Sequence, residues 1–423
     1  MDKIINCVIC LSNKADKSLL IKKLLLHQVP EIFLGLYIGV GQLFSGITVN
    51  ELIVQEERHD CVEVEQSGTR HLRFLSGGEQ KKALLNYLLL KKPDYLIVDN
   101  PMDNLDKDSQ QAFKLKLQEV SFYTPILQLA NRIEDILPFI KNILFVNDDN
   151  MSTYYKDINH FLQYRPIINS LPVFGLMPIS DNKYIIESNP LIAFKNVTVH
   201  YEERVIVKDI CWQINAGEFW QLTGPNGSGK TTLLSLITGD NVKAYGQDLT
   251  LFGKRKGSGE SVWSVKQKIG YFTSSMTDLF GRATTVVQMI VSGFFDSIGL
   301  YMKPSARHLK LADEWLKMIN MINQKHSAFY SLSLGQQRMV MIVRAMVKHP
   351  PLLILDEPSA GLDENNVAIV TALINKIAAN KSSAILYVSH RKEKYLSPEF
   401  IYELSSAKNG STGKKLTLQT CLK

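Results

Sequence analysis

The stretch Gly-Pro-Asn-Gly-Ser-Gly-Lys-Thr-Thr, residues 224–232, lies between two apolar segments, Phe219–Leu222 and Leu233–Ile237. A strand, a glycine-rich turn and a helix in this order form a loop that binds phosphate. Glycines allow backbone N–H groups to turn toward an anion, because no Cβ atom is in the way. These N–H groups and the helix N-terminus favour negative charge. The stretch therefore predicts a nucleotide-binding site in an α/β domain.

Two side chains complete the chemistry that this loop predicts. Lys230 supplies positive charge to the β- and γ-phosphates, and the Thr231 hydroxyl can bind Mg²⁺. We therefore expect the loop to hold a nucleoside triphosphate together with its magnesium ion. The predicted nucleotide-binding residues of the loop are Gly224, Pro225, Asn226, Gly227, Ser228, Gly229, Lys230, Thr231 and Thr232.

Two apolar runs further along the chain each deliver polar residues at their C-terminal ends. Residues 351–355 predict a parallel strand buried on both faces, and Asp356 and Glu357 follow it directly. An acid at the end of such a strand can hold Mg²⁺, and the next one can polarise the attacking water. The second run, 386–389, ends at His390. We predict Asp356 as a metal ligand and Glu357 and His390 as catalytic residues.

The two halves of the chain repeat the same order of motifs. Residues 75–80 read Leu-Ser-Gly-Gly-Glu-Gln, and an apolar strand with an acid at its end follows at 94–101. Residues 332–337 read Leu-Ser-Leu-Gly-Gln-Gln, and the strand with Asp356 follows at 352–358. Similar motifs in the same order indicate an internal duplication.

The Leu-Ser-Gly-Gly-Glu-Gln motif, followed by a buried strand that ends in an acid, resembles the signature of the ATP-binding-cassette (ABC) ATPases. The resemblance implies an α/β fold of two tandem P-loop NTPase domains with helical subdomains, in a pseudo-two-fold head-to-tail pair. It implies an ATP hydrolase that uses ATP and Mg²⁺. It also assigns Tyr201 to stacking on adenine, Leu332–Gln336 to the second signature and His390 to the switch histidine.

Within this family, the segments 249–260, 292–301 and 343–350 resemble the ModF-type ATP-binding proteins of molybdate transport. The resemblance implies a cytoplasmic protein, peripheral at the inner face of the membrane. Two alternatives remain open: a tandem-cassette regulator without a permease, and a ribosome-associated translation factor. Translation factors of this kind carry a long, charged helical linker, whereas residues 164–190 are short and broken by proline.

The first half carries a degenerate version of the phosphate-binding loop at Leu11–Ser18. Lys17 and Ser18 are present, but Leu11 and Asp16 occupy the two glycine positions. A carboxylate about 4 Å from a phosphate charge costs on the order of 4 kcal/mol at an effective dielectric constant near 20. We therefore expect little or no nucleotide binding at this loop.

Two further positions of the first half lack the residue that hydrolysis needs. Asn100 occupies the position of the catalytic glutamate, and an amide cannot act as a general base. Asn131 occupies the position of the switch histidine. We also expect the antiparallel β-subdomain, with its adenine-stacking aromatic, to be missing from this half or to lie upstream of Met1.

Cassettes of the family pair head to tail, so each nucleotide lies between one phosphate-binding loop and the partner's signature. The resemblance then implies one complete site and one vestigial site. In the complete site, Lys230, Thr231, Asp356, Glu357 and His390 face Ser76, Gly77, Gly78 and Glu79. In the vestigial site, Lys17, Ser18, Asp99, Asn100 and Asn131 face Ser333, Leu334 and Gly335.

Transport cassettes carry a glutamine after the strand that corresponds to 269–272, beside the surface that meets the membrane subunit. Thr273 or Ser274 occupies that position here, and Gln42 is the candidate in the first half. The helical subdomain of the first half is also expected to be shorter than that of the second half. We therefore expect weak or no coupling to membrane permease subunits.

The domains predicted from the sequence are a degenerate cassette at 1–163, a linker at 164–190, an intact cassette at 191–410 and a tail at 411–423. Residues 407–415 are expected to be a loop or a frayed tail. The net charge of +7 is spread without a long basic block, so no specific nucleic acid is expected. Cys7 and Cys10 lie three residues apart on an expected strand and point to opposite faces, which argues against a metal site.

Overall fold

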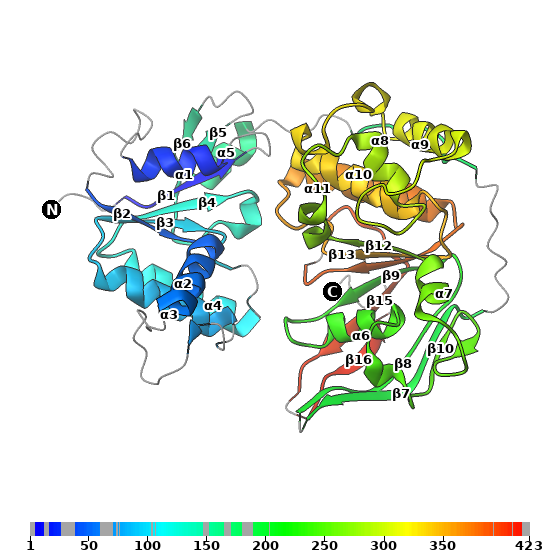
Figure 1. Cartoon of the computed structure of the whole chain (residues 1–423). Coiled ribbons are helices and arrows are strands. Elements are labelled where there is room, and N and C mark those ends of the chain that lie inside the picture. The colour runs from blue at the N-terminus through cyan, green and yellow to red at the C-terminus, as the bar shows by residue number, and fades with distance from the viewer. Residues whose placement is uncertain are drawn as a thin grey trace. The chain divides into compact units, whose positions relative to one another are not determined.

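A computed structural model shows a mixed α/β protein that divides into two compact units (Figure 1). The first unit comprises Met1–Ile168 with Gly361–Glu364, and the second comprises Asn169–Ala360 with Asn365–Lys423. The structure describes residues 5–11, 17–26, 39–59, 71–72, 75, 77–102, 105, 107–146, 152–164, 171–179, 189–202, 204–391, 393–407 and 409–416.

The centre of the second unit is a six-stranded sheet with the order β12-β13-β14-β9-β15-β16. Its first five strands are parallel, and β16 pairs antiparallel with β15. The apolar run before Asp356 forms β13, and four of its five residues are fully buried, as expected of a strand covered on both faces. The strands are β9 Phe219–Thr223, β12 Ile269–Thr273, β13 Leu352–Asp356, β14 Ala384–Val388, β15 Phe400–Ser405 and β16 Thr412–Leu416.

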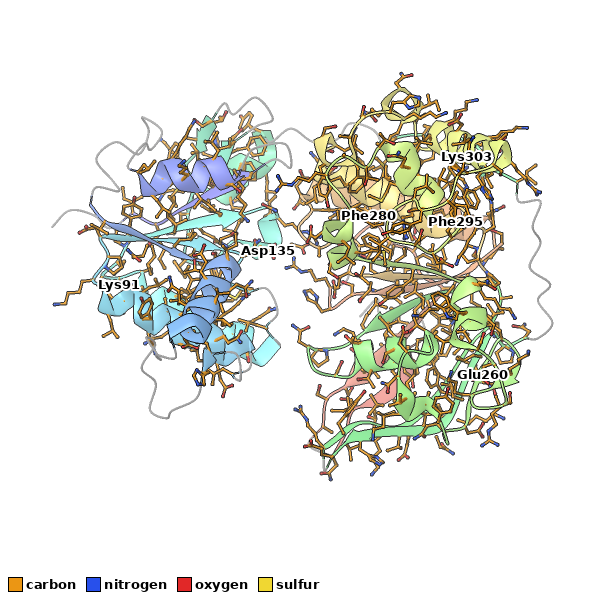
Figure 2. All side chains as sticks on the ribbon, in the orientation of Figure 1. Lys91, Asp135, Glu260, Phe280, Phe295 and Lys303 are labelled. Atoms are coloured by element: carbon orange, nitrogen blue, oxygen red, sulfur yellow. The ribbon has the colours of Figure 1, made fainter. Side chains whose placement is uncertain are left out.

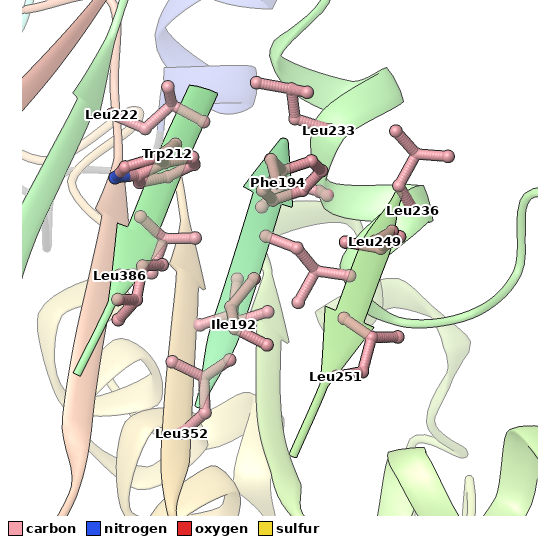
Figure 3. Packing of buried hydrophobic residues seen from close by; sticks show 14 of the residues in the cluster. Ile192, Phe194, Trp212, Leu222, Leu233, Leu236, Leu249, Leu251, Leu352 and Leu386 are labelled. Carbon is pink, nitrogen blue, oxygen red and sulfur yellow. The ribbon is translucent and has the colours of Figure 1, made fainter. Parts of the chain in front are cut away.

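A second, antiparallel sheet of the same unit has the order β11-β10-β7-β8. Figure 3 shows that the apolar side chains of this sheet, among them Phe194 and Trp212, pack toward the parallel sheet and the helix after β9. The Trp212 and Tyr402 rings stack with centroids 4.4 Å apart, which joins the two sheets. The elements are β7 Ile192–Tyr201, β8 Arg204–Ile214, β10 Leu249–Leu251, β11 Lys254–Arg255 and the helix α6 Lys230–Ile237.

Helices between β12 and β13 form the helical part of the second unit (Figure 1). Thr285, Ser305 and Ser333 each close a capping box at the start of a helix, which explains where these helices begin. Phe295, labelled in Figure 2, packs edge-on against His308 of this part, with ring centroids 5.3 Å apart. The helices of the unit are α7 Val262–Gln267, α8 Val286–Ser292, α9 Ala306–Met318, α10 Leu334–Met346 and α11 Glu364–Ala379, with the 3₁₀ turns η4 Val242–Ala244, η5 Ser274–Leu279, η6 Ile322–Gln324 and η7 Phe329–Ser331.

The first unit contains a six-stranded sheet with the order β2-β3-β4-β1-β5-β6. It has the same topology as the central sheet of the second unit, with β1 in the place of β9 and β6 in the place of β16. The internal duplication predicted from the sequence is therefore confirmed. The elements are β1 Cys7–Leu11, α1 Lys17–Leu25, β2 Gly41–Phe44, α2 Gly46–His59, α3 Gly77–Leu90, β3 Tyr95–Asp99, α4 Lys107–Val120, β4 Ile126–Ala130, η3 Ile133–Asp135, β5 Asn142–Val146, β6 Ser152–Tyr155 and α5 Ile158–Tyr164.

The expectation of a loop or frayed tail at 407–415 is wrong, because residues 412–416 form the edge strand β16. Gly413 allows this pairing, since a Cβ atom there would lie 2.3 Å from the Tyr402 ring. Lys415 then places its Nζ atom 4.0 Å from the centroid of the Phe400 ring, a cation–π contact. The second domain therefore extends past residue 410, into the region predicted as the C-terminal tail.

The central part of the predicted linker, residues 171–179, has no helix or strand and belongs to the second unit. The Gly175 amide donates a 2.9 Å hydrogen bond to the Met318 carbonyl, and Asn320 Nδ2 donates to the Val173 carbonyl. This segment is thus held at the C-terminal end of α9. None of the helices that the structure describes has both the length and the apolar character needed to cross a membrane.

Candidate active site

The loop between β9 and α6 has the backbone conformation that only glycine adopts easily. Gly224, Gly227 and Gly229 have φ angles of 153°, 75° and 91°. A Cβ atom on Gly229 would lie 2.4 Å from a methyl group of Val207, and one on Gly224 would lie 2.9 Å from the Leu404 carbonyl oxygen. The glycines at 224 and 229 are therefore required both by backbone conformation and by space.

Lys230 is the first residue of α6 and points back over the loop. Its Nζ atom donates to the carbonyl oxygens of Gly224, at 2.7 Å, and Pro225, at 2.9 Å. Burial lowers the pKa of Lys230, and the negative charges of Glu357 and Asp356 oppose that effect. The ammonium group is thus held at the loop where phosphate would bind, and the exposed Thr231 follows it.

Asp356 ends β13 and is partly buried. Burial raises the pKa of its carboxyl to about 6, the neighbouring Glu357 adds to the increase, and Lys230 opposes it. A bound cation would stabilise the charged form of this carboxylate. Among the described residues, no group of three or more His, Cys, Asp or Glu side chains is arranged to hold a metal ion by itself. A carboxylate oxygen such as that of Asp356 is the kind of ligand that Mg²⁺ prefers, and this ion takes its remaining ligands from phosphate and water in such sites.

Glu357 and His390 are hydrogen-bonded to each other twice. Glu357 Oε1 accepts from the His390 backbone amide at 3.1 Å and lies 2.9 Å from His390 Nδ1. Arg391 Nε donates to His390 Nε2 at 3.2 Å, so the ring proton lies on Nδ1 and is donated to Glu357. No motif of the sequence predicts a role for Arg391.

The environment of Glu357 favours a charged carboxylate. Burial alone would raise its pKa, but the hydrogen bonds from the His390 ring and backbone amide, together with the positive charge of Lys230, lower the pKa overall. Glu357 has a φ angle of 49°, and its amide donates to the Val388 carbonyl at 2.9 Å. The carboxylate is therefore fixed in place and able to accept a proton.

Tyr201 lies at the end of β7 with 44% of its surface exposed. Its hydroxyl accepts a 2.9 Å hydrogen bond from Asn241 Nδ2. Lys243 Nζ lies 5.9 Å from the centroid of the ring. An exposed ring beside the phosphate-binding helix suits the stacking role that the resemblance assigns to it.

Comparison with known proteins decides the family. The ABC transporter family model matches residues 207–360. The ABC transporter ATP-binding protein ModF of Escherichia coli is 38% identical over 375 residues, which cover 84% of this chain and 76% of that protein. This chain belongs to the ABC transporter ATP-binding proteins. An uncharacterized ABC transporter ATP-binding protein of Schizosaccharomyces pombe is 30% identical, over 75% of this chain and 65% of that protein.

A solved structure supports the same fold over most of the chain. An archaeal ribosome recycling factor, crystallised in complex with a ribosomal stalk protein, matches with a TM-score of 0.61 and 17% identity. The match covers 98% of this chain and 86% of that one. At this level of identity the similarity shows the fold alone. The family match and this fold together show an ABC-type ATPase with two tandem cassettes, the first and the second cassette.

The register of the strands places the altered residues of the first cassette at the expected positions. Asp99 ends β3 as Asp356 ends β13, and Asn100, with a φ angle of 42°, follows it in the same left-handed conformation as Glu357. The β4 residue that pairs with Asp99 lies two positions before Asn131, and the β14 residue that pairs with Asp356 lies two positions before His390. Asn131 therefore corresponds to His390. The first cassette therefore has amides where the second has its carboxylate and its histidine.

Lys17 of the first cassette has a different partner from Lys230. It begins α1, and its Nζ atom lies 2.5 Å from Asp99 Oδ1 in an ion pair. Leu11 ends β1, whereas Asp16 lies outside the described residues. The Lys-Ser remnant is thus placed as in a phosphate-binding loop, but its lysine is neutralised by an aspartate of the same cassette.

Gln42 does not occupy the position after the second strand, so this expectation is wrong. It pairs with Leu96 as Gly270 pairs with Leu353, which places it inside β2. The residue that corresponds to Thr273 is instead Ser45. Both hydroxyls accept from a backbone amide three residues on, and so both begin a helical turn.

The two signature segments differ in the room that they leave at their glycines. Ser333 begins α10, and a Cβ atom on Gly335 would lie 1.9 Å from Asn366 Oδ1. In the first cassette, Gly78 near the start of α3 has its nearest neighbouring side-chain atom 3.6 Å away, on Leu105. The predicted site residues Gly77, Gly78 and Glu79 lie in the first turn of α3, and Ser76 lies outside the described residues.

Proposed function

We propose that ATP is hydrolysed at one composite site, formed by the second cassette's catalytic residues and the first cassette's signature. The observation that supports it most directly is the Glu357–His390 pair, whose counterparts in the first cassette are Asn100 and Asn131. At these corresponding positions the second cassette has a carboxylate that can accept a proton, whereas the first cassette has an amide. The participation of Ser76, Gly77, Gly78 and Glu79 rests on the resemblance to head-to-tail cassettes.

In the proposed reaction, water attacks the γ-phosphorus as the bond to the bridging oxygen of ADP breaks. Glu357 Oε1 is occupied by His390, so Oε2 is the oxygen that accepts the water's proton. His390 keeps the carboxylate oriented and charged. Lys230 and the loop amides stabilise the charge that develops on the phosphate oxygens.

Mg²⁺ would be held by Asp356 and the Thr231 hydroxyl, both of which offer the oxygen ligands that this ion prefers. When bound, the ion neutralises charge on the β- and γ-phosphates. Tyr201 would stack on the adenine. We propose that the first cassette's own nucleotide site is vestigial, because Asp99 already neutralises Lys17.

Two variants test the catalytic assignment. Lys230→Ala removes the charge from the phosphate site, and Glu357→Gln removes the base while leaving nucleotide binding intact. Each should lower steady-state ATP turnover by about 100-fold or more. Equilibrium titration of Glu357→Gln protein with ATP and Mg²⁺ should saturate near one nucleotide per chain, and two equally tight sites would contradict the proposal.

For the biological role, we propose a cytoplasmic ATPase of the molybdate-transport group that couples weakly or not at all to a permease. The group rests on the resemblance to ModF-type proteins, and the 38% identical relative carries that name. Thr273, in the position of the coupling glutamine, argues against tight coupling. A regulator without a permease is the alternative. Copurification with a membrane permease, with ribosomes or with neither separates these roles.

A further inference from the structure

Asn241 contacts both Tyr201, the proposed base-stacking residue, and α6, the helix that follows the predicted phosphate-binding loop. It lies between α6 and η4 and is 8% exposed. Its Nδ2 atom donates to the Tyr201 hydroxyl at 2.9 Å and to Ser235 Oγ at 3.0 Å. Ser235 lies on α6, the helix that begins at Lys230. One amide group thus joins the aromatic ring at the end of β7 to the phosphate-binding helix.

The orientation of this amide is determined by its neighbours. Asn241 Oδ1 accepts a 3.0 Å hydrogen bond from the Lys243 backbone amide, which can only donate. The Nδ2 group must therefore face Tyr201 and Ser235. The Ser235 hydroxyl donates its own hydrogen bond to the Thr232 carbonyl at 2.8 Å, so its oxygen is available to Asn241 as an acceptor.

These bonds form a continuous chain from Thr232 through Ser235 and Asn241 to the Tyr201 hydroxyl. Thr232 directly follows Thr231, the predicted magnesium ligand. The position of the ring is therefore set relative to the phosphate-binding helix, not only by its own strand.

The strand gives Tyr201 less support than a regular ladder would. The pairing of β7 with β8 shifts register three times between Phe194 and His200. Tyr201 is 44% exposed, so few neighbours restrict its side-chain torsions. Fixing such a side chain on ligand binding has an entropic cost, which is smaller when the free protein already holds the bound rotamer.

We propose that Asn241 is a positioning residue, which holds the Tyr201 ring through its hydroxyl so that the ring is ready to stack on the base of ATP. This inference rests on the proposed stacking role of Tyr201. It predicts a contribution to the binding of the base and none to the binding of the phosphates.

The test compares ATP with inorganic tripolyphosphate, which has the phosphates but no base. Both dissociation constants are measured with Mg²⁺ on full-length Glu357→Gln protein. Tyr201→Phe and Asn241→Ala should each weaken ATP binding between about twofold and tenfold and leave tripolyphosphate unchanged. The double variant should be no weaker than either single one, because both remove the same hydrogen bond.

Tyr201→Ala separates the failure of this inference from the failure of the stacking role. If Tyr201→Ala leaves ATP affinity unchanged, the stacking role itself is wrong. If Tyr201→Ala weakens ATP binding but Tyr201→Phe and Asn241→Ala do not, stacking stands and the positioning role is overturned. Equal losses for ATP and tripolyphosphate in Asn241→Ala would also overturn it, since the residue would then act through the fold. Asn380→Ala, at an exposed asparagine that donates to Ser382, is the control and should change neither constant.

Discussion

Lys17 and Asp99 form an ion pair in the first cassette, with 2.5 Å between Nζ and Oδ1. The corresponding lysine of the second cassette, Lys230, instead donates to the carbonyls of Gly224 and Pro225. A phosphate that reached Lys17 would have to compete with a carboxylate that is only 12% exposed. The degenerate loop has therefore kept its lysine in a contact that stabilises the cassette.

The ion pair predicts that Lys17→Ala affects folding more than catalysis. The variant leaves the largely buried Asp99 without this cation, so the free energy of unfolding should fall by about 1–3 kcal/mol. Steady-state ATP turnover at a temperature where the protein is folded should stay near the wild-type value. Denaturant unfolding and turnover are measured on the same preparation. A loss of turnover as large as that of Lys230→Ala would show that the degenerate loop works in catalysis.

The proposed head-to-tail pairing predicts a crossed effect in the signature of the first cassette. Ser76→Arg places a bulky cation where the nucleotide bound by the second cassette should meet this signature, so ATP turnover should be lost. Lys17→Ala, in the same cassette, serves as the comparison. Turnover that survives in Ser76→Arg protein would refute the composite site.

The signature glycines predict opposite effects on stability. Gly335→Ala would bring a Cβ atom within 1.9 Å of Asn366 Oδ1, so we expect a loss of about 1–3 kcal/mol. Gly78→Ala has room and lies in a helix, where alanine is favoured over glycine by up to about 1 kcal/mol. Midpoints of chemical unfolding should therefore fall for the first variant and stay unchanged or rise for the second. Equal losses would show that the two helix starts are under the same constraint.

His349 predicts a dependence of stability on pH. It is partly buried against Trp315, with ring centroids 5.5 Å apart, and burial lowers its pKa to about 4. The unfolded chain, with a histidine pKa near 6.5, binds the proton more readily, so stability is full above about pH 6.5 and falls as the pH drops toward 4. The total loss is about 3 kcal/mol, measurable by urea unfolding between pH 7.5 and 4.5.

Replacement of this histidine should reduce the slope of the free energy of unfolding against pH. His349 has a φ angle of 50°, a conformation that asparagine tolerates, so His349→Asn is the suitable variant. His326→Asn, at an exposed histidine, should keep the wild-type slope. If both variants have the same pH dependence as the wild type, His349 is not the group responsible.

Much of the site could be predicted from the sequence because its chemistry lies in short contiguous motifs. The loop at 224–232 can bind phosphate only with its glycines and lysine in that order, and a buried strand must precede Asp356 and Glu357. The duplication made Asn100 and Asn131 recognisable as replacements, and the strand register agrees with both assignments.

Other features were decided by contacts with residues outside the segment itself. Thr412–Leu416 lacks the composition of a strand. It forms one because β15 pairs with it at the edge of the sheet and the Tyr402 ring packs against it. Which residue of the second cassette corresponds to Gln42 could be assigned only from the pairing of β2 with β3. A shift of a few residues along a strand cannot be read from one sequence.

The sequence by itself determined which residue types the nucleotide site has, because phosphate binding and proton transfer require particular groups at particular spacings. Only the tertiary structure decided what holds those groups. Asp99 meets Lys17, Arg391 sets the histidine tautomer, and Asn241 links Tyr201 to α6. The Asp99 and Asn241 contacts join separate elements, and the Arg391 contact depends on the direction of two neighbouring side chains. Such hydrogen bonds and ion pairs depend on distances of about 3 Å, which only the packing of the folded chain establishes.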